Sequence, residues 1–297
     1  MAPSKELDAV LEMIRKRSAE VRKTTDDDRL SYERIMSVLP MDDDIQTERV
    51  GANGVPAEWI WAPESQEDRV ILYLHGGGYL FGSARTHRVM LAHLARAAKA
   101  RVLALDYRLA PEIPFPAPVE DSVSAYQWLL SKGISSEKMA FGGDSAGGGL
   151  VIAALVALRA VGEPMPAAGV CISAWTDMES TGPSMATNAE TDPSVSKERL
   201  LRIAKVYLDG KDPRAPLASP IHADLTGLPP LLLQVGSIEV LLDDSTLLKT
   251  RANEAGVPVE MEVWDDMPHV WHHYAPILPE ARKAIGKIGD FVLQHTG

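Results

Sequence analysis

The sequence of 297 residues predicts an α/β fold in which a mostly parallel sheet carries helices on both faces. Short apolar runs bounded by turn signals suit strands that are buried on both sides. These runs are RVILYLH, RVLALDY, KMAFGG, AAGVCIS and LLLQVG. Helical segments lie between them, at 88–98, 119–130 and 147–160. Strands that alternate with helices in this way indicate parallel neighbours joined by crossover helices.

Two helices are expected before the first strand. Apolar residues recur at helical spacing in the first one, at Leu7, Val10, Leu11 and Ile14. The second is predicted over 32–38, between acidic triplets at 26–28 and 42–44 that suit solvated helix ends and turns better than a ligand cluster. Because the first helix must bury its apolar stripe, we expect it to pack as a lid over the mouth of a pocket.

Later segments complete the sheet and extend the lid. The first strands are expected in TERV and AEWIWA, and VPVEMEVW alternates apolar and polar residues, which favours a strand at a sheet edge. About sixty residues separate the strands at Cys171 and Leu231, too many for a plain crossover. Ser196 can cap an amphipathic helix in this interval. We therefore expect an insertion there that belongs to the lid.

The composition argues against nucleic acid or an anionic membrane as a partner, because the formal net charge is −11. The most apolar run, 150–158, is too short to span a bilayer, and MAPSKELDAV lacks the apolar core of a signal peptide. Cys171 is the only cysteine, so no internal disulfide can form, and we expect it to be buried in a strand. These features predict a soluble, cytoplasmic protein.

The stretch FGGDSAGGG places one hydroxyl among glycines. Gly143 to Gly147 matches the G-x-S-x-G pattern around Ser145, with an apolar strand before it and an apolar helix after it. Glycines let the backbone turn sharply, lift the hydroxyl into a pocket, and let the helix pack closely on the sheet. This context predicts that Ser145 is a nucleophile. The alternative is a glycine-rich helix start without chemistry.

A second glycine-rich stretch, HGGGY, follows the strand RVILYLH. Bare glycines leave peptide N–H groups that can point outward, and an oxyanion needs two or three such donors. We expect Gly76 and Gly77 to supply two of them and Ala146 the third. A phosphate-cradling loop or a plain turn are the alternatives, although no G-K-S/T follows. His75 is expected to orient the loop rather than transfer protons.

A serine nucleophile needs a base, and His269 lies in DDMPHVWHHY after the last predicted strand. His272 and His273 are expected at the start of a helix, on or near the surface. No metal site is predicted, since H-x-x-H-H is a weak ligand spacing and H-E-x-x-H is missing from the sequence. The loop, the serine and the histidine all follow strands, where an open parallel sheet places its active site.

Five stretches carry a resemblance to a known family. HGGGY, YRLAPEIPFPAPVED, GGDSAGG, ASPIHADLTGLPPLLLQVG and DDMPHVWHHY resemble the bacterial hormone-sensitive-lipase-like carboxylesterases, from about Val70 to His273. The resemblance implies an α/β-hydrolase fold with an eight-stranded sheet, serine esterase chemistry and a preference for short acyl chains. It also implies a helical cap, made of residues 1–45 and an insertion near 180–215, on a catalytic domain of residues 46–297. Family members often form homodimers, some of them through the last strand, which VPVEMEVW would supply.

The family pattern does not identify the acid, because the D-P-L triplet of many members is missing here. Three candidates follow the strand LLLQVG: Glu239, Asp243 and Asp244. Glu239 comes three residues after Gly236, within the loop beyond the strand tip. The two aspartates come about one helical turn later, where acids favour a helix N-terminus. We therefore predict Glu239 as the acid, ahead of Asp243.

Together these features predict a carboxylic ester hydrolase that acts on small-molecule esters through an acyl-enzyme. Ser145 attacks the carbonyl, His269 is the base, Glu239 orients it, and no metal or organic cofactor is needed. Two alternatives stay open. One is an amidase or acyltransferase on the same site, and the other is a non-catalytic ligand-binding protein on the same fold.

Overall fold

Eight strands form one sheet in a computed structural model that describes residues 4–19, 24–36 and 38–297. Their order across the sheet is β1-β2-β4-β3-β5-β6-β7-β8. The strands are β1 (Gln46–Ala52), β2 (Val55–Trp61), β3 (Gln66–Leu74), β4 (Ala100–Leu105), β5 (Met139–Asp144), β6 (Ala168–Ile172), β7 (Leu231–Gly236) and β8 (Val259–Trp264). Strand β2 is antiparallel to β1 and β4, and the other pairs between these strands are parallel. The predicted mostly parallel sheet is confirmed.

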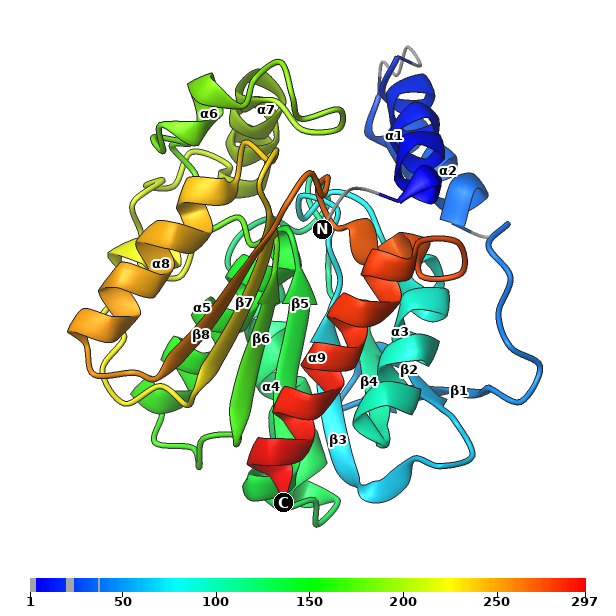
Figure 1. Cartoon of the computed structure of the whole chain (residues 1–297). Coiled ribbons are helices and arrows are strands. Elements are labelled where there is room, and N and C mark those ends of the chain that lie inside the picture. Colours follow the sequence, from blue (N-terminus) through cyan, green and yellow to red (C-terminus); the bar gives the residue numbers. More distant parts are fainter. Residues whose placement is uncertain (1–3, 20–23, 37) are drawn as a thin grey trace.

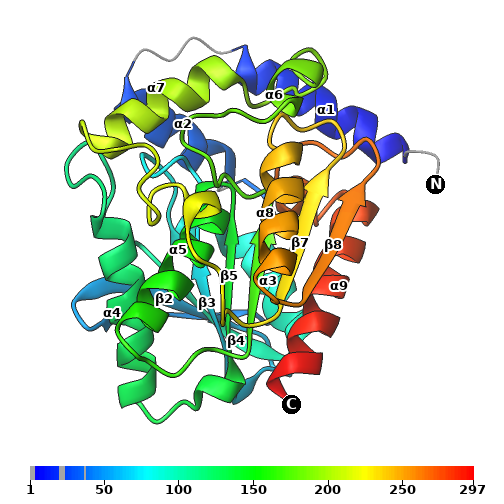
Figure 2. The ribbon, with the colours of Figure 1, turned by 90° about the vertical axis from the view of Figure 1, so that its left-hand side faces the viewer.

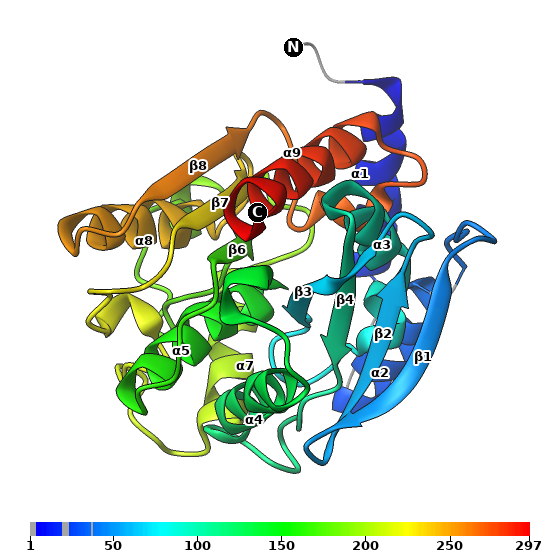
Figure 3. The ribbon, with the colours of Figure 1, turned by 90° about the horizontal axis from the view of Figure 1, so that it is seen from below.

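Alternate residues of the central strands pack into two apolar cores, one on each face of the sheet. In β3, Leu72 belongs to one core and Ile71 to the other, as the two-residue period of a strand requires. One face is covered by α4 (Ala117–Ser131), α5 (Ala146–Ala160) and α8 (Leu242–Glu254), and the opposite face by α3 (Ala84–Ala98) and α9 (Pro279–Thr296) (Figure 3). The apolar runs in the sequence are therefore strands buried on both sides.

The strand order reverses between β3 and β5, because the chain leaves β3 for β4 on one side and returns to β5 on the other. Loops after two such strands diverge and leave a crevice at the carboxyl end of the sheet. The HGGGY stretch follows β3 and Ser145 follows β5. The topology thus brings these two stretches to one place.

Four helices lie above the carboxyl ends of the strands, as Figures 1 and 2 show, and we call them the roof. They are α1 (Lys5–Ser18), α2 (Thr25–Met36), α6 (Ser184–Thr187) and α7 (Lys197–Leu208). The apolar stripe of α1, with Leu7, Val10 and Ile14, is buried. Ser196 caps α7 as expected, since its hydroxyl accepts a hydrogen bond from the N–H of Arg199.

The second helix differs from the sequence prediction of 32–38. It begins at Thr25 and ends at Met36, and residue 37 lies outside the described residues. Reciprocal hydrogen bonds explain the earlier start: the N–H of Thr24 donates to Asp27, and the N–H of Asp27 donates to the Thr24 hydroxyl. The acidic triplet 26–28 occupies the first turn of this helix, where negative charge is favourable.

Strand β8 is at the edge of the sheet, as its alternating sequence indicated, and Cys171 is buried in β6. The described residues also form three short 3-10 turns: η1 (Ser136–Lys138), η2 (Pro220–His222) and η3 (Trp271–Tyr274). Within the described ranges, none of the helices has both the length and the apolar composition needed to cross a bilayer.

Candidate active site

Ser145 lies at the sharp turn between β5 and α5. Its φ of +53° and ψ of −122° are unusual for a residue with a side chain, and they aim the hydroxyl away from the sheet. The turn leaves no room beside it. A Cβ atom on Gly143 would collide with the backbone of Gly147, and one on Gly147 would collide with the carbonyl oxygen of Leu74. The glycines around the serine are therefore required by close backbone approach.

A chain of hydrogen bonds joins Ser145, His269 and Glu239. His269 Nε2 is 2.9 Å from Ser145 Oγ, and His269 Nδ1 is 2.8 Å from Glu239 Oε2. Because a carboxylate can only accept, Nδ1–H donates to Glu239 and the Nε2 lone pair faces the serine hydroxyl. Burial opposes protonation of His269, but the hydrogen bond and charge of Glu239 outweigh it and raise the pKa of the imidazole.

The two aspartates that the sequence offered as alternatives face other partners. Asp243 accepts the N–H of Ser184. Asp244 accepts the N–H groups of Thr176 and Asp177, and burial raises its pKa to about 7. Both aspartates tie α8 to the segment after β6. Glu239 is the candidate that the fold brings to His269.

The loop after β3 corrects one prediction. The N–H of Gly76 donates to Asp144 Oδ1 at 3.0 Å, so this group is not available to a substrate oxyanion. Gly77 and Gly78 line the cavity that contains Ser145, and both have positive φ, at 120° and 62°. In the described part of the chain, the N–H groups of Gly77, Gly78 and Ala146 have no acceptor. The free donors are thus shifted by one residue from the predicted Gly76 and Gly77 pair.

Comparisons with known proteins identify the family of this chain. Residues 71–273 match the family model of the alpha/beta hydrolase fold. The chain belongs to the α/β-hydrolase family. An esterase structure from the bacterial hormone-sensitive lipase family has a TM-score of 0.98 and 67% identity, over 100% of both chains. This α/β hydrolase is accordingly a member of the hormone-sensitive-lipase-like branch.

Two further relatives are esterases by their descriptions. An acetyl-hydrolase of Streptomyces hygroscopicus is 53% identical over 241 residues, which are 81% of this chain and 80% of that protein. A crystal structure of an esterase soaked with p-nitrophenyl butyrate has a TM-score of 0.95 and 46% identity, over 99% of each chain. Relatives of this kind, together with the fold, make this α/β hydrolase a carboxylic ester hydrolase.

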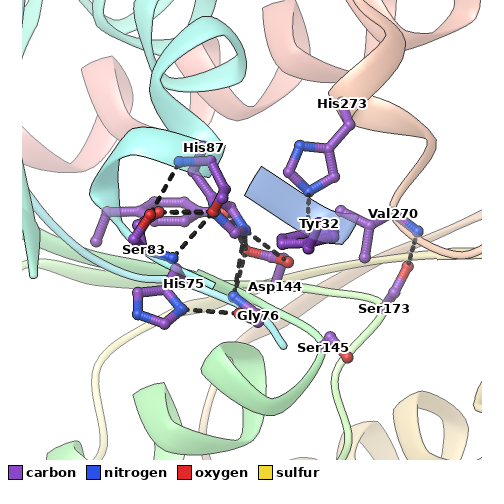
Figure 4. A network of polar contacts seen from close by, with 12 residues as sticks. Tyr32, His75, Gly76, Ser83, His87, Asp144, Ser145, Ser173, Val270 and His273 are labelled. Atoms are coloured by element: carbon purple, nitrogen blue, oxygen red, sulfur yellow. Dashed lines mark hydrogen bonds and ion pairs between the residues drawn. The ribbon is translucent and has the colours of Figure 1, made fainter. Parts of the chain in front are cut away.

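A buried polar network holds the HGGGY loop in place (Figure 4). Asp144 accepts hydrogen bonds from the hydroxyl of Tyr73 at 2.9 Å and from Gly76, and it lies 3.1 Å from Nε2 of His87. These partners hold the pKa of Asp144 below its usual value, although burial alone would raise it. His75 Nδ1–H donates to the carbonyl oxygen of Gly76, and burial lowers the pKa of His75 to about 3. A neutral His75 orients the loop, as its place in the sequence suggested.

The prediction that His272 and His273 lie on or near the surface is wrong. They are 0% and 5% exposed. Val270 adopts φ +49°, which turns the chain back into η3 and packs it beneath the roof. His272 Nε2 then lies 2.7 Å from Oε1 of Gln234, and His273 Nε2 lies 3.1 Å from the hydroxyl of Tyr32 on α2 (Figure 4). Burial lowers the pKa of both imidazoles.

His273 also lies in a cluster that could suit a metal ion, because its ligand atom and those of His87 and Asp144 are all within 4.8 Å of one another. Each of the three side chains has a hydrogen-bond partner in the network just described.

Sequence analysis missed Ser173, which contacts Glu239 and the residue that follows His269. Its hydroxyl donates to Glu239 Oε1 at 2.7 Å and accepts the N–H of Val270, the residue after His269. Ser173 has φ +48° and is fully buried. Its position directly after the apolar run AAGVCI was the only signal in the sequence.

The cavity above Ser145 encloses about 100 Å³ of free space. Its floor comes from the loops after β3, β5, β6 and β8, with Gly77, Gly78, Ser145, Trp175 and His269. Its upper wall comes from the roof, with Arg17, Tyr32, Met36, Arg199, Leu200 and Ile203. The cavity therefore joins segments that are far apart in the sequence.

Proposed function

We propose that this enzyme hydrolyses short- to medium-chain carboxylic esters through an acyl-enzyme on Ser145. The observation that carries the proposal is the hydrogen-bonded chain from Glu239 through His269 to the Ser145 hydroxyl, at 2.8 and 2.9 Å. A serine hydroxyl becomes a nucleophile when an imidazole can take its proton, and the imidazole needs a carboxylate to fix its tautomer.

In the proposed reaction, Ser145 Oγ attacks the ester carbonyl while His269 Nε2 takes the hydroxyl proton. The carbonyl oxygen becomes an oxyanion, for which the N–H groups of Gly77, Gly78 and Ala146 are suitable donors because the protein leaves them without acceptors. His269 then gives the proton to the leaving alcohol. Water repeats the sequence on the acyl-enzyme and releases the carboxylic acid.

The roof supports a preference for short acyl groups, because side chains of α1, α2 and α7 cover the space above Ser145. The related esterase that was soaked with p-nitrophenyl butyrate is consistent with this range. We also propose that the helices of residues 1–45 and the insertion near 180–215 act together as a cap that limits acyl length, because α1, α2 and α7 supply the upper wall of the cavity.

The test combines active-site labelling with a panel of p-nitrophenyl esters from acetate to palmitate. A fluorophosphonate should form an adduct on Ser145, and kcat/KM should be highest for the short esters. Absence of the adduct would support a non-catalytic binding protein. Faster turnover of matched amides, or transfer to alcohols instead of water, would support an amidase or acyltransferase.

We further propose a cytoplasmic location and a homodimer through β8. The acidic composition is the basis for the first. The second is supported by the edge position of β8, where Val263 is 47% exposed. Light scattering on the wild type and on Val263→Asp tests the dimer: a wild-type mass of about 32.2 kDa would exclude it.

A further inference from the structure

The roof places a positive charge without a partner on the cavity wall. Arg17, near the end of α1, lines the same cavity as Ser145 and is half-buried. Among residues 4–19, 24–36 and 38–297, its guanidinium has neither a hydrogen-bond acceptor nor an ion-pair partner. A charge that is partly removed from water without compensation raises the free energy of the empty pocket. A negatively charged group in the substrate would relieve this.

The other charges on the cavity wall are already compensated. Asp28 lies 3.2 Å from Arg199, whose guanidinium also lies 5.8 Å above the ring of Phe81. Asp144 accepts hydrogen bonds from Tyr73 and Gly76 and lies beside His87. Arg17 is thus the charged side chain of this wall to which the described residues give no partner.

The charge of Arg17 acts inside the cavity rather than in open solvent. Burial raises the pKa of Tyr32 and of Tyr274, and the guanidinium opposes both shifts. Burial lowers the pKa of His273, and the guanidinium adds to that shift. These three side chains line the cavity together with His269. The positive charge therefore acts on three side chains of the cavity wall.

We propose that Arg17 binds a carboxylate at the end of the substrate remote from the scissile ester, so that this enzyme prefers anionic esters over neutral ones. The substrates would be half-esters of dicarboxylic acids or acyl esters of hydroxy acids. A planar guanidinium can donate two parallel N–H···O bonds to a carboxylate, which an uncharged group cannot match. This assignment rests on the proposed esterase function of Ser145.

Two matched substrate pairs test it, one for each side of the ester. On the alcohol side, 4-acetoxybenzoate is compared with 4-acetoxybenzamide, and on the acyl side monomethyl glutarate is compared with methyl glutaramate. In each pair the carboxylate and the amide have nearly the same shape. We expect the anionic-to-neutral ratio of kcat/KM to fall about tenfold in Arg17→Gln for at least one pair, which identifies the side that reaches Arg17.

Arg15→Gln is the matched control. It removes one positive charge from the same helix, but Arg15 is exposed and does not line the cavity. Its ratios should stay at the wild-type values. In the wild type, raising the ionic strength from about 0.01 M to about 1 M should also lower the ratio, since the Debye length shrinks from roughly 30 to roughly 3 Å.

Equal ratios in the wild type and Arg17→Gln for both pairs would overturn the proposal, as would an equal fall in Arg15→Gln. Turnover of the neutral esters by the wild type distinguishes failure of the substrate assignment from failure of the proposed function. If the neutral esters are cleaved and the ratio does not depend on Arg17, only the substrate assignment fails. If neither ester is cleaved, the proposed function fails as well.

Discussion

The floor and the roof of the cavity are built in different ways. The floor consists of loops at strand ends, where backbone geometry holds Ser145 at φ +53° and the glycines beside it cannot carry a Cβ atom. The roof consists of helices that are held to the rest of the molecule by side chains. From this difference we predict that the chemistry depends on the floor and that substrate selection depends on the roof.

The attachment of α2 illustrates how the roof is held. Arg29 donates to the carbonyl oxygens of Leu80 and Ala110 and forms a two-pronged ion pair with Glu112 at 2.7 Å. Asp28 on the same helix pairs with Arg199 on α7. Each of these contacts joins residues at least 51 positions apart. If floor and roof are distinct in function, changes in the floor should lower kcat and changes in the roof should alter KM and selectivity.

The largest effect should come from the nucleophile. Ser145→Ala should lower kcat by a factor on the order of 10⁶, because no other hydroxyl is placed against His269 Nε2 in the described chain. Circular dichroism should match the wild type, since Ser145 adds no side-chain cap to α5. A variant that kept a tenth of the wild-type kcat would mean that another group is the nucleophile.

The acid should give the next largest effect. Glu239→Gln should lower kcat about 10⁴-fold, because an amide in place of the carboxylate no longer holds His269 in the tautomer that faces Ser145. Asp243→Asn is the control. Asp243 lies on the same side of the sheet as Glu239, but it bonds to Ser184. Its replacement should therefore mainly lower thermal stability. Wild-type kcat in Glu239→Gln with a collapse in Asp243→Asn would assign the acid to the aspartate.

The pH dependence of kcat/KM should show a smaller effect, which also depends on a residue of the floor, His269. His269 must be neutral to accept a proton, so kcat/KM should rise about tenfold per pH unit up to its pKa and then level off. Glu239 raises that pKa, so the rise should end above roughly 6.5, the value for a free histidine. In the residual activity of Glu239→Gln, the rise should move to lower pH. A profile that is flat from about pH 5 to 9 would contradict a histidine base.

The smallest effect on kcat should come from the roof. Arg29→Gln removes partly buried hydrogen bonds from a charged side chain. Each such bond contributes at most about 1.5–3 kcal/mol to the free energy of unfolding. We expect a lower melting temperature and a higher KM for neutral esters, with kcat within a few-fold of the wild type. Glu112→Gln keeps the two bonds from Arg29 to carbonyl oxygens and should show a weaker form of the same effect. If Arg29→Gln lowered kcat as strongly as Glu239→Gln, the separation of floor and roof would be wrong.

Much of the floor could be predicted from short stretches of sequence, because its requirements are local. A serine between a buried strand and a buried helix, with glycines on both sides, admits few backbone conformations. His269 followed from its place after the last strand. Glu239 could be predicted because it comes three residues after the end of β7 at Gly236. A loop this short keeps its residues close to the tip of the strand.

The errors in the floor came from contacts between strands. Gly76 has the residue type of an oxyanion donor, but Asp144 on the neighbouring strand takes its N–H. Ser173 could not be connected with Glu239 and Val270 before β6 and β7 were placed side by side. A sequence motif indicates which backbone N–H groups are present. Only the packed sheet decides which of them remain without a hydrogen-bond acceptor.

By itself, the sequence determined the sheet and the places of the proposed nucleophile Ser145 and the proposed base His269, because strand burial and tight turns depend on neighbouring residues. The tertiary structure decided the roof. The packing of α1, α2 and α7 over the strand ends decides three things. It decides whether Tyr32 contacts His273, whether Arg199 pairs with Asp28, and whether Arg17 is left without a partner. Those contacts join distant segments through long, flexible side chains, and no local pattern in the sequence encodes such pairings.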